Sequence, residues 1–194
     1  MKSSKYNTQK FINCVLFFAK KTDPKKLGIL KLNKLLYYID FGHYKKYGRP
    51  ILGDVYIRMD HGPVPSFSYN LFNAAFRDKN DDPDSNELRK CVEIKPDRVK
   101  DFKINTIYPK NIDFDASLFS ESELKIMETV ALAYFSKSGT AMSKETHKDD
   151  TPWSKTPAMQ PVDYDLILDK NSISKDYINY WKEEEKILDS FPCK

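Results

Sequence analysis

The sequence lacks a long apolar run, and this absence argues against a membrane protein. No window of about 18 residues, the length that a transmembrane helix needs, is uninterruptedly apolar. The longest apolar cluster near the N-terminus, residues 11–19, is broken by Asn13 and is followed by no small-residue cleavage site. We therefore expect a protein that neither spans a membrane nor is secreted.

Cysteine is also scarce. Cys14, Cys91 and Cys193 are odd in number, far apart and without a Cys-x-x-Cys pair. This spacing fits neither a disulfide framework nor a zinc site, so we expect no metal. Free thiols are typical of a reducing compartment, which indicates the cytoplasm.

The common catalytic and cofactor-binding motifs are missing as well. The sequence has no Gly-x-x-x-x-Gly-Lys-Ser/Thr loop, Gly-x-Gly-x-x-Gly, His-Glu-x-x-His or Gly-x-Ser-x-Gly, so we expect no cofactor. Of the three histidines, His43 falls on an apolar helical stripe, where a hydrogen-bonded core residue is the usual finding. His61, at a Gly-Pro turn, and His147, at a predicted helix end, are better placed for contact. The least favoured function is an enzyme that uses these two histidines with a carboxylate, for which the candidates are Asp40, Asp60 and Asp149.

Positive charge is concentrated in the first quarter of the chain. Residues 1–50 hold 12 Lys and Arg and 2 acidic residues, whereas residues 51–194 hold 20 and 26. Such asymmetry marks a docking face for an acidic protein, a nucleic-acid surface or simply solvated helix faces. Because nearly all of these residues are lysine rather than base-reading arginine, an acidic protein partner is favoured over nucleic acid.

Six segments are predicted as helices, because their apolar residues recur at three- and four-residue steps. They cover residues 8–22, 26–47, 64–75, 120–137, 138–149 and 175–190. Pro24 separates the first two, and Gly48 permits a left-handed end to the second. Ser120 and Glu123 form a capping box at the start of the fourth.

Period-two alternation is confined to short segments. Residues 55–59 predict a strand, and the Gly-Pro-Val-Pro sequence at 62–65 predicts a stiff turn after it. Residues 92–94 and 102–104 predict a small hairpin, whereas the polar stretch 77–90 predicts a loop. The 194 residues are thus predicted to form one domain, mainly α, a compact helical domain with a small antiparallel β element.

The functional centre is predicted between residues 31 and 69. On the second helix Lys34, Tyr37, Tyr38 and Asp40 lie largely off the apolar stripe, which leaves an aromatic and charged face. Tyrosine-rich faces are typical of protein interfaces. The alternative is that Tyr37 and Tyr38 pack under the predicted strand.

Three groups of residues here resemble motifs of the Panacea-domain, or SocA-like, antitoxin family. They are KLNKLLYY at residues 31–38, YGRP at 47–50 with GPV at 62–64, and Thr146-His147 followed by Pro152-Trp153. Together they bracket residues 9–153, which leaves 154–194 as a variable helical tail. Asn33 stands where the family commonly has glutamine, a mild departure.

The resemblance implies a helical fold with a small β element, a gene beside a toxin gene, and direct binding that silences the toxin. It also implies that delivery of the toxin to a protease is an available mode. It does not specify the toxin, and we expect partner choice to lie in residues 77–118 and in the tail after residue 153. The residues at motif positions are Lys34, Tyr38, Asp40, Gly62, Pro63, His147 and Trp153, and His61 is added as their polar neighbour.

The roles of these residues divide into structural and binding ones. Gly62 and Pro63 are expected to fix a bend, and a core position is the expected role of Trp153. The polar members are candidates for recognition or for a structural network among themselves. The favoured function is an antitoxin, and the first alternative is a DNA-binding autoregulator suggested by the basic first quarter.

Overall fold

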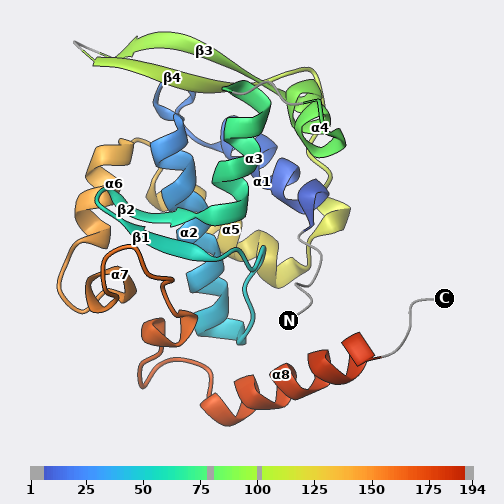
Figure 1. The fold of residues 1–194 in the computed structure, drawn as a ribbon, viewed down its shortest axis with the longest axis vertical. Coiled ribbons are helices and arrows are strands. Elements are labelled where there is room, and N and C mark those ends of the chain that lie inside the picture. Colours follow the sequence, from blue (N-terminus) through green and yellow to red (C-terminus); the bar gives the residue numbers. More distant parts are fainter. Residues whose placement is uncertain (1–6, 78–80, 100–101, 191–194) are drawn as a thin grey trace.

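The computed structural model describes residues 7–77, 81–99 and 102–190, which are mostly helical (Figure 1). Helix α2 (Ile29–Tyr47) lies at the centre, in contact with α1 (Thr8–Lys21), α5 (Glu121–Ala133) and α6 (Gly139–Thr146). Two small antiparallel sheets complete the fold, so the predicted mainly α class with a minor β element is confirmed. Cys193 lies outside the described residues.

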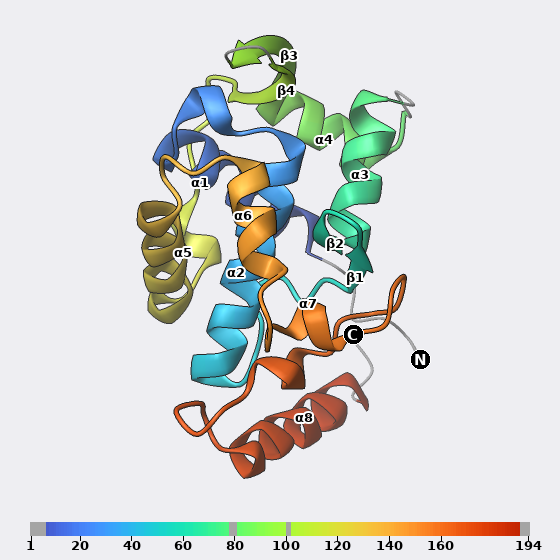
Figure 2. The ribbon, with the colours of Figure 1, turned by 90° about the vertical axis from the view of Figure 1, so that its left-hand side faces the viewer.

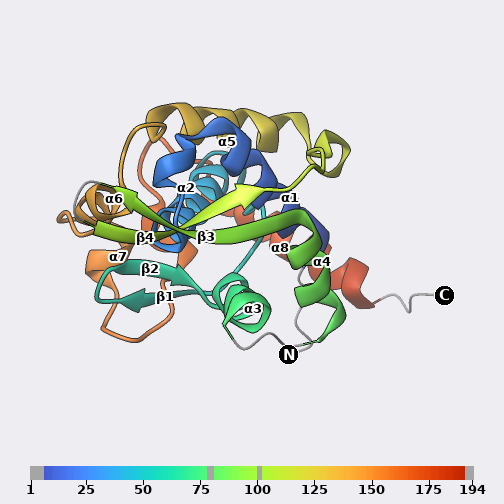
Figure 3. The same cartoon turned by 90° about the horizontal axis from the view of Figure 1, so that it is seen from above.

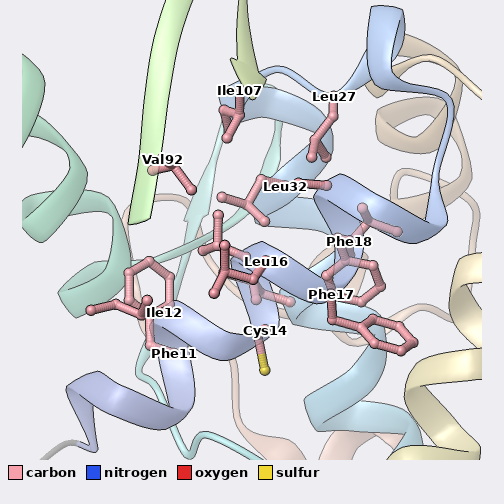
Figure 4. Close-up of a cluster of buried hydrophobic side chains, with 14 of the residues drawn as sticks. Phe11, Ile12, Cys14, Leu16, Phe17, Phe18, Leu27, Leu32, Val92 and Ile107 are labelled. Atoms are coloured by element: carbon pink, nitrogen blue, oxygen red, sulfur yellow. The ribbon is translucent and has the colours of Figure 1, made fainter. Parts of the chain in front are cut away.

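The main hydrophobic core forms around α1 and α2. Residues 11–19 of α1 are all buried, and Phe11 and Phe18 have no exposed surface. Figure 4 shows these side chains in one cluster with Leu32 of α2. Leu27, Val92 and Ile107 from other segments belong to the same cluster. Each large side chain buried in this way contributes about 2 kcal/mol of hydrophobic stabilisation.

Helix α2 is enclosed on almost every side, which the sequence does not reveal. Figure 3 shows α5 on one side of it and the β1 (Tyr56–Met59) and β2 (Gly62–Pro65) hairpin on the other. Every residue from 31 to 37 is therefore buried. The prediction that the side of α2 with Lys34, Tyr37 and Asp40 faces solvent is wrong, because the hairpin and the C-terminal segment cover this side.

The predicted strand is confirmed, but the predicted stiff turn at residues 62–65 is wrong. These residues form β2, which pairs with β1 in the register Tyr56 with Pro65 and Met59 with Gly62, and the turn lies at residues 60–61. Proline is tolerated here because β2 is an edge strand, whose outward positions need no N–H donor.

A segment of the predicted tail extends this hairpin on the other edge of β1. The Val162 N–H donates to Tyr56 O at 2.7 Å, and the Arg58 N–H donates to Gln160 O at 2.9 Å. The segment follows the short helix α7 (Pro152–Lys155) and leads into the 3-10 helix η3 (Tyr164–Ile167). Part of the tail is therefore built into the hydrogen-bonded framework.

The predicted loop at residues 77–90 is wrong for its second half, which is helix α4 (Pro83–Cys91). The Asp82 carboxylate accepts from the Ser85 N–H, and Pro83 occupies the first turn, where its missing N–H costs nothing. Leu88 and Cys91 form a narrow buried stripe against the preceding helix α3 (Ser66–Phe76). Two apolar residues are too few to show as a helical period in the sequence.

The predicted second hairpin is confirmed and is longer than expected. Strands β3 (Val92–Val99) and β4 (Phe102–Pro109) pair throughout. The Ile107 N–H also donates to Leu27 O at 2.8 Å, just after the 3-10 helix η1 (Pro24–Lys26). The 3-10 helix η2 (Ala116–Leu118) then leads to α5, whose predicted capping box is present.

The last helix, α8 (Lys175–Ser190), was also predicted. It lies along the end of the molecule opposite β3 and β4 (Figures 1 and 2). Ile178 is buried and holds it near Gly48, the left-handed residue that ends α2.

Candidate functional site

The motif residues of α2, β2 and α6 meet at a close backbone approach around Gly62. This glycine has φ of +100°, a conformation that side chains disfavour. A Cβ added there would lie 2.6 Å from Thr146 Oγ1 and 2.7 Å from Lys34 Cε. Only glycine therefore lets β2 lie this close to both helices.

Lys34 and its neighbours hold this junction together by hydrogen bonds. The fully buried Lys34 ammonium donates to Pro63 O at 2.8 Å. Ser143 Oγ donates to His61 O at 2.7 Å, and Thr146 Oγ1 donates to Ser143 O at 2.8 Å. The backbone of the β1–β2 turn is thus held from two helices at once.

Beside the turn, three side chains form a stack that remains partly exposed. The rings of His147 and Trp153 are parallel within 14°, with centroids 3.9 Å apart. The Arg58 guanidinium lies 4.3 Å from the Trp153 ring, and the indole Nε1–H donates to Met59 O at 3.0 Å. Trp153 is half-buried, so its expected core position is wrong, and both Arg58 and His147 pack on its ring.

Asp40 lies in a second network on α2, away from the turn. Its Oδ1 accepts from the N–H groups of Ile51 and Leu52 at 2.9 and 2.7 Å, and its Oδ2 accepts from the Tyr56 hydroxyl at 3.0 Å. The Tyr164 hydroxyl lies 3.2 Å from the same Oδ2. This carboxylate therefore joins α2 to the following loop, to β1 and to the tail.

Burial shifts the pKa values of these two motif residues in opposite directions. Desolvation lowers the pKa of the Lys34 ammonium to about 7, because no carboxylate compensates its charge. Desolvation raises the pKa of the Asp40 carboxyl to about 6, against the opposing effect of its hydrogen bonds. Lys31, whose ammonium donates to Phe135 O, has its pKa lowered to about 8 by the same cause.

The lowered pKa of Lys34 predicts that stability rises with pH near neutrality. The unfolded chain holds the lysine proton up to about pH 10, so it binds more protons than the folded chain above about pH 7. Urea unfolding from about pH 7 to pH 8 should show a slope approaching 1.4 kcal/mol per pH unit. Lys34→Met should flatten that slope, and Lys125→Met, on the exposed face of α5, should leave it unchanged.

Lys31 adds a similar contribution above about pH 8, so the lower part of the range is the diagnostic one. An unaltered slope in Lys34→Met would contradict a desolvated ammonium at this position.

The structure brings some of the predicted site residues together and separates others. Lys34, His61, Gly62, Pro63, His147 and Trp153 surround the β1–β2 turn. Asp40 belongs to the second network, and the half-buried Tyr38 stacks on Tyr134, the residue that follows α5, with ring centroids 4.6 Å apart. His43 is buried, with Nδ1 2.6 Å from Arg49 O, so its predicted core position is confirmed.

Sequence reasoning missed Arg58 and Tyr164. Arg58 was considered only as part of an alternating strand, and Tyr164 lies in the tail beyond all the motifs. The alternation of β1 was a usable signal for Arg58, because it places this side chain on the face opposite Ile57. No sequence signal indicated that Tyr164 reaches Asp40, since 124 positions separate them.

Several basic residues of the first quarter that the structure describes are buried or paired with acidic residues. Lys31 and Lys34 are buried. Three more of its lysines form ion pairs with distant acidic residues, namely Lys10 with Glu123, Lys20 with Asp113 and Lys45 with Asp169. These positions disperse the charge that suggested DNA binding.

Among residues 7–77, 81–99 and 102–190, no three His, Cys, Asp or Glu side chains come together as metal ligands would. None of the helices in that part of the chain combines the length and apolar composition that membrane crossing requires.

A central helix, a small hairpin and a close approach that requires glycine together define a mainly helical scaffold. The family model for the SocA-like antitoxin, Panacea domain, matches residues 32–154, which include every motif residue of this junction. The chain belongs to this antitoxin-like family. No curated protein and no solved structure matches the chain.

Proposed function

We propose that this chain is an antitoxin that neutralises a toxin protein by binding it directly. The observation that carries the proposal is the family match over residues 32–154. The structure is consistent with a binding role, because most of the motif polar groups are engaged in holding the scaffold. Lys34 and Asp40 are fully buried, and the groups other than burial that shift the pKa of His147 are all basic. That environment lacks the orienting carboxylate of a histidine base.

Co-expression with the protein encoded beside this gene tests the proposal. The neighbouring protein, expressed alone from an inducible promoter, should stop growth, and co-expression of this chain should restore it. Gly62→Ala, which disrupts the junction, serves as the non-functional control. Full toxicity in the presence of folded wild-type chain, or a harmless neighbour, would rule the proposal out.

The mode of neutralisation is a finer question within the same proposal. We favour occlusion by direct binding over delivery to a protease. Occlusion predicts that growth is rescued equally in cells that lack the ATP-dependent proteases, and that the toxin half-life is unchanged. Rescue that is lost in those cells, with a toxin that persists, would assign the adaptor mode instead.

A further inference from the structure

Four basic side chains from separate elements converge at the β1–β2 turn. Arg58 lies on β1, His61 in the turn, His147 at the end of α6, and Lys34 on α2 beneath them. The last three elements meet at Gly62, and the Trp153 ring links Arg58 to His147. We name these four residues the basic cluster. After burial, the positive charges of the other three members lower the pKa of His147.

The basic cluster is accessible and has unused donors. His61 and His147 are exposed, and Arg58 is half-buried. The ring nitrogens of the two histidines make no hydrogen bond to any residue that the structure describes. Arg58 donates Nη1 to Thr156 O, which leaves its other N–H groups available.

One of the acidic residues next to the cluster in sequence is paired elsewhere. Asp60, Asp149 and Asp150 adjoin the cluster in sequence and are exposed. Asp150 pairs with Lys155 at 3.5 Å, outside the cluster. Like charges held this close repel each other, and an anion placed among them relieves that repulsion.

The stack also indicates which kind of anion fits. His147 stacks on the Trp153 ring and the Arg58 guanidinium also packs over it, so this ring is already engaged and makes a poor stacking platform for a nucleobase. What the cluster offers is a set of N–H donors, of which those of Arg58 and His147 belong to side chains packed on the Trp153 ring. Guanidinium and imidazolium N–H groups bind the oxygens of a carboxylate through charge-assisted hydrogen bonds.

We propose that the basic cluster receives a carboxylate side chain, aspartate or glutamate, from the surface of the bound toxin. The proposal rests on the proposed antitoxin function and adds to it the docking position and the chemistry of the partner. Arg58 and Trp153 are of the residue types that dominate binding energy in interfaces, and here each is held in place by a hydrogen bond to the backbone.

A carboxylate docked at the basic cluster makes the binding affinity depend on pH. An anion favours the protonated imidazole, so a bound carboxylate raises the pKa of His147. The groups that face His147 are Lys34 from α2, Arg58 from β1 and His61 from the turn. Binding therefore takes up protons, and affinity should increase as the pH falls from about 8 to about 6.

A titration of the full chain with a short acidic peptide tests the cluster without the toxin. The probe is acetyl-Asp-Glu-Asp-amide at constant ionic strength, and the matched control is acetyl-Asn-Gln-Asn-amide. The chain has two tryptophans, so the indole N–H of Trp153 reports on the cluster and that of Trp181 on α8. We expect saturable NMR shifts of Trp153, His61 and His147 with the acidic peptide, none with the neutral one, and an unmoved Trp181.

Single substitutions test which side chains of the basic cluster bind the acidic peptide. Arg58→Gln and His147→Gln should each weaken binding of the acidic peptide about tenfold, because each removes a charge-assisted hydrogen bond. Arg58→Lys keeps the charge and should retain much of the binding. Lys125→Gln removes an exposed charge on α5 and should have no effect. Non-saturable shifts spread over surface lysines, or equal affinity in Arg58→Gln, would overturn the proposal.

The same variants separate this proposal from the antitoxin function. If the neighbouring toxin binds and Arg58→Gln and His147→Gln leave its dissociation constant unchanged, the basic cluster is not the docking position although the chain is an antitoxin. If the acidic peptide binds but the neighbouring protein does not, the cluster is an anion site and the antitoxin function is wrong.

Discussion

Gly62→Ala is expected to lower the free energy of unfolding by about 3 kcal/mol or more. Two effects add, because a side chain at φ of +100° is strained and its Cβ would overlap Thr146 Oγ1 and Lys34 Cε. Neither neighbour moves away easily, since both side chains are buried and hydrogen-bonded. Urea or thermal unfolding at neutral pH measures the loss.

Gly53→Ala is the matched control for this prediction. Gly53 also has positive φ, +69°, but the nearest atom to an added Cβ is Pro50 Cγ at 3.5 Å, an ordinary contact. Its loss should be about 1 kcal/mol, from backbone strain alone. Equal losses at the two positions would contradict the close approach at the junction.

Asp40→Ala is expected to cost about 3 kcal/mol, because it removes the acceptor of the buried Ile51 N–H, of the part-buried Leu52 N–H and of one hydrogen bond of the Tyr56 hydroxyl. The Ile51 and Leu52 donors belong to the loop that connects α2 to β1, so the loss should loosen that connection as well. Chemical unfolding at about pH 7 gives the magnitude, and hydrogen exchange at the two amides locates it.

Asp40→Asn separates hydrogen bonding from charge at the same position. The amide oxygen still accepts from the two N–H groups, and the tyrosine hydroxyls can turn to accept from the amide nitrogen. The carboxyl has a folded pKa of about 6, above its unfolded value, so it destabilises the fold as pH rises through that range. Asp40→Asn should abolish this pH-dependent loss of stability. It should also lower the free energy of unfolding by less than Asp40→Ala does. A larger loss in the amide variant would contradict the assignment.

The long helices could be predicted from the sequence because each has one apolar face and recognisable ends. For α2, the apolar periodicity does not reveal which of the remaining side chains are buried. A stripe on Leu32, Leu36 and Ile39 predicts one buried side, but the hairpin and the tail cover the other side too. No local pattern could place Lys34 in the interior, because its burial depends on where residues 62 and 146 lie.

The candidate site was predictable in part for a similar reason. The seven motif residues and His61 were identified individually, and six of these eight residues do gather at the β1–β2 turn. Arg58 was missed because arginines in short strands are commonly solvent-exposed and have no special role. Only the contact of its guanidinium with the Trp153 ring distinguishes Arg58 from them. Partner choice by residues 77–118 and by the tail stays a prediction, as does the single-domain organisation.

The most direct test of the central claim is the dissociation constant of the purified chain with the purified product of the neighbouring gene. Calorimetric titration at physiological salt should show a saturable complex of fixed stoichiometry, with a dissociation constant of about 100 nM or tighter. The toxin activity should fall in proportion to the fraction of toxin that is bound. A folded, active toxin that gives no binding heat and keeps full activity in excess chain would contradict the claim that this protein is an antitoxin.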